Sequence, residues 1–210
     1  VTLSEHQSKE YLRRWGIPVN REVLAATPQE AAASAALLGL PVAVKASGAE
    51  LAHKSELSLV ELDLRAPQEV GQACRRLLER VPGLREFSVQ EVVAGRRELI
   101  AGLVRDPHYG PAVMLGLGGI TAEALGDVVF RVAPLCVEDA LDMMDELRGR
   151  RLLEAFRGEP ALDRQALAEI LVTLGRIGLE DERVAEIDIN PLKICQGRPV
   201  AVDALVALTI

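Results

Sequence analysis

The stretch "VAVKASGAELAHKSELSLVEL", residues 42–62, predicts a strand, a loop and a second strand. Its apolar start, Val42–Val44, is typical of a short buried strand, and the alternation over Leu57–Leu64 is typical of a half-buried one. Lys45 follows the first strand directly, at the entrance to a loop of small residues. It is either an exposed lysine that ends a strand or a compact cation placed to meet phosphate oxygens.

The loop itself contains Gly48, His53 and Lys54. A loop histidine is usually a surface residue, but a neutral imidazole beside a phosphate-contacting lysine can act as a nucleophile and accept a phosphoryl group. Leu57-Ser58-Leu59 stands where a phosphate-binding loop is expected to be richest in glycine. The residues alone therefore leave both interpretations open.

Helices flank this stretch on both sides. Ser4 with Gln7 forms a capping-box pattern, and Thr27 followed by Pro28 is a second helix start. The expected elements of the N-terminal part are helices that end at Gly16 and Gly39, a helix opened by Pro67, and strands at Val23–Ala25, Val42–Val44 and Leu57–Leu64.

After about residue 85 the pattern shifts toward strands separated by turn residues. We expect strands at Phe87–Val93, Glu98–Val104, Pro111–Leu115, Val128–Ala133, Val184–Ile189 and Val200–Val206, and helices at Glu138–Leu147 and Arg164–Ile177. The sequence therefore predicts an α+β protein with two lobes. A small helix-strand lobe at 1–87 precedes a larger lobe at 88–210, which is built around a mainly antiparallel sheet, and clefts between lobes are common ligand sites.

Composition narrows the class of protein. The 210 residues carry a net charge of −7, so we expect neither nucleic acid nor a membrane surface as a partner. Cys74, Cys136 and Cys195 are odd in number and far apart, which predicts reduced thiols and not a zinc site or disulfide framework. No apolar run approaches the roughly 20 residues of a membrane helix. We expect a cytoplasmic protein and, because helix-start residues follow Val1 at once, an excised domain.

The run Glu186-Ile187-Asp188-Ile189-Asn190-Pro191 alternates polar and apolar residues. A strand with this pattern puts Glu186, Asp188 and Asn190 on one face. With Asp203 on the neighbouring expected strand, these oxygen-bearing side chains form a site for a hard cation. Mg²⁺ needs only one or two carboxylates besides the phosphate oxygens of a substrate. The alternative is the ordinary polar face of an edge strand.

Four other features also allow two interpretations. Gln90–Val93 is either a strand end or a hinge whose backbone reads an adenine edge, and Glu98 either binds a ribose or cation or pairs with an arginine. The turn Gly116–Gly119 is either an anion-binding loop or a tight turn. Arg131 lies in an otherwise apolar strand, where an anionic partner explains a charge better than packing does.

Taken together, these stretches resemble the ATP-grasp domain of the ADP-forming acyl-CoA synthetases, a family related to the β subunit of succinyl-CoA synthetase. The resemblance covers nearly the whole chain, in order, through "LSEHQSKEYLRRWGIPV", "GLPVAVKASGAELAHKS", "VQEVVAGRRELIAGLVRDPHYGPAVMLGLGGITAE", "FRVAPL" and "EIDINPL". Five motifs in the same order along the chain make the resemblance to this family specific. The resemblance implies a bilobed ATP-grasp fold that holds ATP or ADP between its lobes.

The resemblance also implies roles for individual residues. Lys45 would bind the nucleotide phosphates, helped by the backbone from Gly48 onward. Glu91 and Val93 would form the adenine hinge, and Glu98 would be a further nucleotide contact. Asn190 and Asp203 would ligate Mg²⁺, with Asp188 beside them.

The same resemblance implies a catalytic group made of His53, Lys54 and Arg131. In this family a histidine at the position of His53 carries phosphate between the nucleotide site and the CoA-binding part. Acyl-CoA and phosphate give an acyl phosphate there, and the phosphate then passes through histidines to ADP, or the reverse. The expected partners are CoA-binding and ligase domains, fused or in a separate subunit, and an oligomer is compatible with this scheme.

One departure from the family pattern keeps other functions open. After His-Lys-Ser the family usually has an acidic residue, an apolar residue and then Gly-Gly-Val, whereas this chain continues with Glu56-Leu57-Ser58-Leu59-Val60. Glycine allows a close backbone approach and positive φ, which Leu59 does not offer freely. The alternatives are a degenerate ATP-grasp module with a regulatory or binding role, as in synthetase-like protein acetyltransferase fusions, and a different ATP-grasp ligase.

Overall fold

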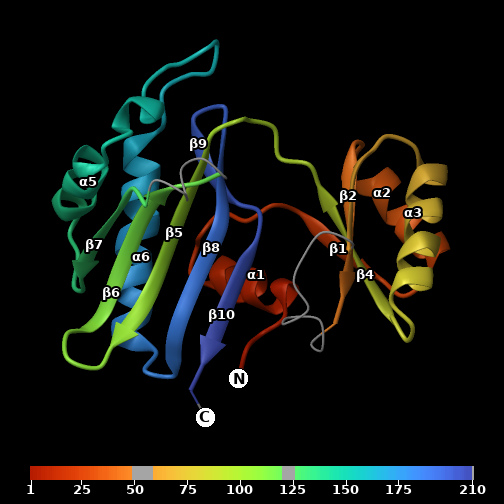
Figure 1. Ribbon diagram of the computed structural model, residues 1–210, viewed down its shortest axis with the longest axis horizontal. Helices are drawn as coiled ribbons and strands as arrows, with labels where there is room; N and C mark the ends of the chain where they lie inside the picture. Colours follow the sequence, from red (N-terminus) through yellow and green to blue (C-terminus); the bar gives the residue numbers. More distant parts are fainter. Residues whose placement is uncertain (49–58, 120–125, 210) are drawn as a thin grey trace. The chain divides into compact units, whose positions relative to one another are not determined.

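The chain folds into two compact units, each built on an antiparallel sheet (Figure 1). The structure is a computed structural model and describes residues 1–48, 59–119 and 126–209. The smaller unit contains Ser4–His6 and Asn20–Val92, and the larger contains Val1–Leu3, Gln7–Val19 and Val93–Ile210. Helix α1 (Glu5–Arg14) has residues in both. The division at residues 87 and 88 stays a prediction.

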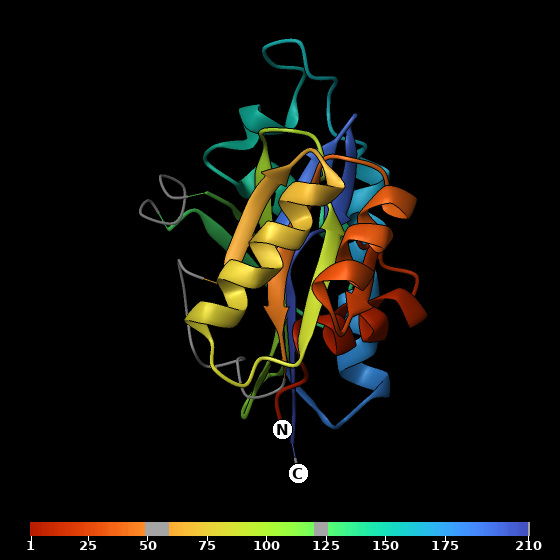
Figure 2. The ribbon, with the colours of Figure 1, turned by 90° about the vertical axis from the view of Figure 1, so that its right-hand side faces the viewer.

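The smaller unit has four strands, in the order β1-β4-β2-β3, with every neighbouring pair antiparallel. The strands are β1 (Glu22–Ala25), β2 (Val42–Ser47), β3 (Val60–Leu64) and β4 (Glu86–Glu91). Helices α2 (Pro28–Leu38) and α3 (Pro67–Arg80) cover one face of this sheet, and Figure 2 shows α3 lying across it.

Strand alternation divides the residues of the smaller sheet between two faces. Val44 and Val89 are fully buried against the helices, together with alanines of α2 and apolar residues of α3. Lys45 and Ser88 are register partners and point to the other face. The Thr27 side chain accepts a hydrogen bond from the Glu30 amide at 3.2 Å, which confirms the predicted helix start.

The larger unit has a six-stranded sheet in the order β10-β8-β5-β6-β7, with β9 also paired to β8 and every pairing antiparallel. The strands are β5 (Glu98–Asp106), β6 (Gly110–Leu117), β7 (Val128–Val132), β8 (Val184–Cys195), β9 (Arg198–Ala201) and β10 (Ala204–Leu208). The mainly antiparallel larger sheet and the α+β class are therefore confirmed.

In the described part of the chain, helices cover one face of this sheet. Helix α6 (Arg164–Glu180) packs on β5 and β6, and α5 (Val137–Glu146) packs on β7 (Figure 1). The main core lies between these helices and the strands, and a short 3₁₀ helix, Arg150–Leu153, adds to it through Leu153. No helix among the described residues is long and apolar enough to cross a membrane.

The expected strand Val200–Val206 is wrong. The chain bends at Val202 and Asp203, so that β9 pairs with the second half of β8 and β10 pairs with the first half. Two backbone hydrogen bonds hold the bend against β8: the Val202 amide donates to the Pro191 carbonyl, and the Asn190 amide donates to the Asp203 carbonyl. These partners are distant in sequence, so local alternation does not reveal the break.

Candidate functional site

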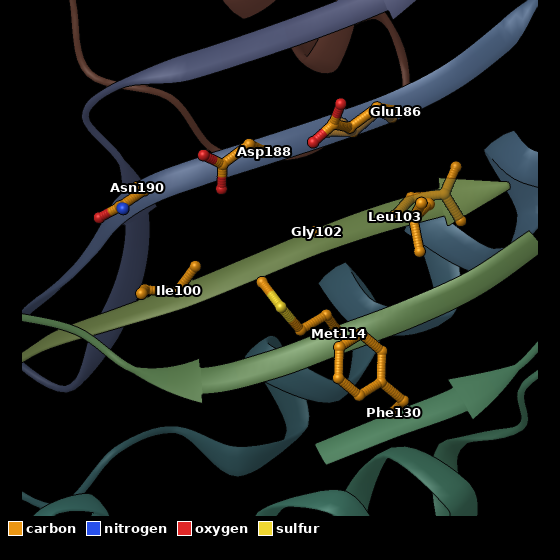
Figure 3. A pocket seen from close by; sticks show the side chains of 10 residues that line it. Ile100, Gly102, Leu103, Met114, Phe130, Glu186, Asp188 and Asn190 are labelled. Atoms are coloured by element: carbon orange, nitrogen blue, oxygen red, sulfur yellow. The ribbon is translucent and has the colours of Figure 1, made fainter. Parts of the chain in front are cut away.

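The uncovered face of the larger sheet carries a cavity of about 370 Å³ (Figure 3). Strands β5 and β8 supply most of its wall, and β6 and β7 supply one residue each. The lining residues are Ile100, Gly102, Leu103, Val104, Met114, Phe130, Glu186, Ile187, Asp188 and Asn190. A row of polar side chains therefore lies beside a short apolar surface on the same face of the sheet.

The polar row comes from alternation along β8, as the sequence predicted. Glu186, Asp188 and Asn190 line the cavity, and Figure 3 shows their side chains on the same side of the strand. Ile187 and Ile189 point the other way and are buried in the core. The shared face of the three polar residues is confirmed.

Asp203 lies next to this row, but not on a strand as expected. It occupies the bend before β10, where its carbonyl accepts a hydrogen bond from the Asn190 amide at 3.2 Å. That bond places the Asp203 backbone beside Asn190 at the end of the polar row. The two residues expected to share a metal are thus adjacent through their main chains.

The chemistry of these donors fits Mg²⁺. Asp188, Asn190 and Asp203 offer hard oxygen ligands, and Mg²⁺ takes one or two carboxylates with the rest of its shell supplied by water and substrate phosphate. Within the described part of the chain no group of three or more His, Cys, Asp or Glu residues is placed to hold a metal ion. A site of this kind fits a cation that arrives with an anionic ligand, and the metal role stays a prediction.

Gly102 forms part of the cavity wall because β5 and β8 approach each other closely there. A Cβ atom at Gly102 would lie 2.6 Å from the Ile187 carbonyl oxygen, closer than any real contact. Met114 and Phe130 lie beside it, and Phe130 remains 50% exposed. The arrangement suits a ligand with a flat apolar part and an anionic part.

Glu98 opens β5 on the same face as Ile100, two residues further along. Its carboxylate is 3.6 Å from the Lys193 ammonium nitrogen, and its carbonyl accepts a hydrogen bond from the Gly118 amide at 2.8 Å. A Cβ at Gly118 would lie 3.0 Å from the Glu98 carbonyl carbon, so glycine permits this turn to pack on the strand.

Lys193 was not among the residues expected at this site. Strict alternation from Asn190 puts Lys193 on the buried face, but a register shift in the pairing of β5 with β8 changes the phase near Pro191. The signal that could have found it is Pro191 itself, because proline inside a strand marks an irregularity.

Lys45 ends up on the open face of the smaller sheet, inside β2 instead of directly after it. Its ammonium nitrogen is 2.8 Å from a carboxylate oxygen of Glu5. Gly48 follows the strand and is exposed. His53 and Lys54 lie outside the described residues, so their expected roles stay predictions.

Glu91, expected at the adenine hinge, ends β4. Its carboxylate accepts hydrogen bonds from the Arg21 amide at 2.8 Å and the Arg21 Nε at 2.7 Å. The Glu91 amide in turn donates to the Arg21 carbonyl. Val93 is half-buried just beyond the strand. The hinge role of both residues stays a prediction.

Arg131 is not brought to the cavity. It alternates with Phe130 along β7 and forms two hydrogen bonds with the carboxylate of Glu146 on α5, which raise the pKa of the guanidinium. The anionic partner expected for this arginine is thus present within the larger unit. Its catalytic role stays a prediction that this pairing does not support.

Comparison with known proteins identifies the fold. A family model described as an ATP-grasp domain matches residues 1–208. The β subunit of acetate–CoA ligase (ADP-forming) I from Pyrococcus furiosus is 38% identical over 98% of this chain and 91% of its own length. The single-chain acetate–CoA ligase (ADP-forming) I of Archaeoglobus fulgidus is 34% identical, and the match spans 91% of this chain but 29% of that protein.

A solved structure from Ca. Korarchaeum cryptofilum resembles this chain both in sequence and in fold. It is a dinucleotide forming acetyl-coenzyme A synthetase 1, and its complex with coenzyme A, Ca-AMPCP and HgCl⁺ gives a TM-score of 0.93 at 39% identity, over 99% of this chain and 93% of that one. Another structure of that protein contains coenzyme A and Mg-AMPPCP, with its phosphohistidine segment pointing towards the nucleotide binding site, and gives a TM-score of 0.87 at 39% identity over the same shares of the two chains.

The family model covers nearly every residue, and the relatives are similar over the same span. The fold they share is the one described above, with two antiparallel sheets and helices on one face of each. The chain belongs to the ATP-grasp family and, within it, to the β-subunit-like domains of the ADP-forming acyl-CoA ligases.

Proposed function

We propose that the chain binds ADP or ATP with Mg²⁺ and serves as the ATP-grasp part of an ADP-forming acyl-CoA synthetase. The complete reaction interconverts acyl-CoA, ADP and phosphate with a carboxylic acid, CoA and ATP. The observation that carries the proposal is the row of Glu186, Asp188 and Asn190 beside the apolar surface of Met114 and Phe130. A nucleotide combines the flat apolar base and the anionic, metal-binding phosphates that such a surface suits.

Each expected residue has a task in this scheme. Asn190 and Asp203, with Asp188 beside them, would hold Mg²⁺, which neutralises phosphate charge during transfer. Lys45 adds a compact cation for the phosphate oxygens. Glu98, which lies 3.6 Å from Lys193, adds a polar contact at the start of β5.

The adenine end of the nucleotide falls to Glu91 and Val93 in this proposal. Glu91 ends β4, and Val93 lies beyond the strand, where the backbone groups no longer belong to the ladder of the sheet. Arg131 has the least structural support among the expected site residues, because its guanidinium already pairs with Glu146.

The phosphate relay is proposed to pass through His53. Acyl-CoA and phosphate give an acyl phosphate and free CoA. The imidazole then attacks the phosphorus atom, the carboxylate leaves, and ADP finally takes the phosphoryl group and becomes ATP. Support comes from the Korarchaeum relative, which is described with a phosphohistidine segment pointing towards its nucleotide site. Lys54 would assist by neutralising phosphate charge.

Partners are proposed from the domain content of the relatives. One relative is a β subunit of similar length, whereas another is a single chain of which this domain matches 29%. The matched domain is thus a subunit in one relative and a part of a longer chain in the other. We therefore propose that CoA-binding and ligase domains, in the same chain or in a second subunit, complete the reaction, and that the enzyme works in the cytoplasm as an oligomer.

One observation keeps the degenerate module as a second candidate. Ser58-Leu59 replaces the glycine pair that the family usually has after its histidine motif. A chain that binds nucleotide but passes no phosphate to His53 would fit that substitution. The named relatives are ligases, which favours the catalytic function.

Nucleotide binding is tested by titration calorimetry of Mg-ADP and Mg-ATP into the full chain and into Asn190→Ala. Loss of one metal ligand is expected to weaken binding by about 10- to 100-fold. Gln165→Ala, which changes an exposed polar residue of α6 away from the cavity, is the control and should bind as the parent does. Absence of binding by the parent chain would contradict the proposed function.

The relay is tested by incorporation of radiolabelled phosphate in the complete enzyme, which includes the CoA-binding domains. His53→Ala is expected to remove the acid-labile label from this chain. The matched control is His108→Ala, because His108 is an exposed histidine in the β5–β6 turn. Equal labelling of the parent and His53→Ala would remove His53 from the mechanism.

A further inference from the structure

The open face of the smaller sheet carries a connected set of polar side chains around Lys45. Strand register places Lys45 opposite Ser88 on β4, and Gln90 opposite Glu22 on β1. Glu5, from the first turn of α1, completes the set within this unit. This face is the one that the two helices leave uncovered.

Glu5 makes two short contacts with this face. One oxygen of its carboxylate is 2.8 Å from the Lys45 ammonium nitrogen and 2.8 Å from the Gln90 side-chain nitrogen. The Lys45 side chain is 15% exposed and that of Glu5 is 26% exposed. A single carboxylate oxygen therefore joins the lysine of β2 to the amide of β4.

A second row of contacts fixes the groups behind Glu5. The Gln90 amide donates to the Ser88 hydroxyl at 3.0 Å, and that hydroxyl donates to the Glu22 carboxylate at 3.2 Å. Gln90 is 2% exposed and Ser88 5%. The Glu22 side chain is only 2% exposed and lies 2.6 Å from the imidazole of His6. Because buried polar groups joined in this way have little freedom, Glu5 is held in one position.

We propose that Glu5 is a positioning residue that holds the Lys45 ammonium group ready for the phosphate groups of the ligand. This role rests on the proposed function, in which Lys45 binds the nucleotide phosphates. A free lysine has a flexible four-carbon stem, and ordering it on binding reduces affinity. Glu5 orders the stem before the ligand arrives, while Gln90 orders Glu5.

Positioning by Glu5 and simple charge competition predict opposite changes in phosphate affinity when Glu5 is removed. If Glu5 merely neutralised Lys45, its removal would expose more positive charge and tighten phosphate binding. If Glu5 positions Lys45, its removal weakens binding although one negative charge has gone. An ion pair that serves only folding would change stability and leave affinity alone.

The test measures the dissociation constant of Mg-ADP by calorimetry for the full chain and four variants. Glu5→Ala is expected to bind about three- to tenfold more weakly, the cost of ordering one free side chain. Glu5→Gln keeps the accepting oxygen and should lose less than Glu5→Ala. Lys45→Met should also bind weakly, and adding Glu5→Ala to Lys45→Met should cause no further loss, because Glu5 acts through Lys45.

Glu61→Gln is the matched control. It breaks an ion pair with Arg76 and Arg80 of α3 on the helix-covered side of the same sheet, whereas Lys45 points to the other face, and it should leave the affinity unchanged. Thermal unfolding of each variant verifies folding, and Glu5→Gln decides the question if Glu5→Ala does not fold.

Several outcomes would overturn the role of Glu5. Tighter binding by either Glu5 variant would mean that Glu5 competes with the phosphate groups for Lys45. Equal affinity of Glu5→Ala and the parent would leave Glu5 only a role in folding. Additive losses in the double variant would show that Glu5 does not act through Lys45. A parent chain that binds no Mg-ADP would instead overturn the proposed function, and the Glu5 role with it. The two failures are therefore distinguishable.

Discussion

At the scale of single residues, Asp181 shows how a surface carboxylate becomes part of the larger unit. Arg183 donates to both of its oxygens, at 2.9 Å each, and the Tyr11 hydroxyl donates to one of them at 3.1 Å. These hydrogen bonds, first those from Arg183, lower the pKa of Asp181 to about 2. Burial, together with the same carboxylate, raises the pKa of Tyr11 to about 12.

This pairing predicts an acid-dependent loss of stability. The ionised form of Asp181 is favoured in the folded chain, so its contribution is complete above the unfolded carboxyl pKa of about 4 and disappears as pH falls toward about 2. Asp181→Asn should lower the urea midpoint at pH 7, and the difference from the parent should vanish near pH 2. Asp142→Asn, at an exposed site on α5, is the control. A difference that does not depend on pH would contradict the prediction.

The residues of the candidate site were predictable where the information is local. Alternation along β8 placed Asp188 and Asn190 on one face, and the structure confirms that face. Lys193 was missed because its orientation depends on a register shift between two strands. Glu5 was missed because its contact with Lys45 spans forty residues of sequence and exists only after the strands have paired.

At the scale of elements, cap residues and hydrophobic alternation predicted most boundaries. Helix α2 begins after Thr27 and ends before Gly39, and β5 and α6 begin at their expected first residues. The main errors fall on β8, which continues past its expected end at Ile189 to Cys195, and on β9 and β10, which the sequence merged into one strand. Backbone hydrogen bonds of Pro191 and Asn190 with the bend decide that break, and they follow from tertiary pairing.

Helix α2 offers a direct test of capping. Thr27→Ala removes the hydrogen bond to the Glu30 amide and should lower the free energy of unfolding by about 1 kcal/mol. Thr27→Ser keeps a hydroxyl at the cap and should recover most of that loss. Urea unfolding followed by circular dichroism measures both. An unchanged stability of Thr27→Ala would show that Pro28 and the packing of α2 suffice to start this helix.

At the scale of the whole molecule, the described helices α2 and α3 cover one face of the smaller sheet and α5 and α6 cover one face of the larger, and the opposite faces carry the proposed ligand groups. Lys45 lies on the smaller sheet, where Glu5 of α1 contacts it, whereas Asp188 and Asn190 lie on the larger sheet. Each unit has its own hydrophobic core, so each face is supported independently. The sequence could indicate both faces through alternation, but it holds no local pattern that sets how the units are arranged.

Ligand linkage provides the prediction at this scale. Mg-ADP at 100 times its dissociation constant should raise the free energy of unfolding by about 2.7 kcal/mol, because it binds only the folded chain. Urea unfolding with and without the nucleotide measures the shift. Mg²⁺ alone and adenosine alone should each give much less, since each lacks part of the ligand. Equal stabilisation by adenosine would contradict a phosphate-binding role for this chain.

Gly102 has a practical consequence for redesign of the cavity. The close approach of its backbone to the Ile187 carbonyl leaves no room for any side chain, so a random library at this position would be almost entirely inactive through misfolding. Ile100, Met114 and Phe130 are each at least partly exposed and can change size without moving a strand. A search for altered base preference should therefore vary those three positions and treat Gly102 as invariant.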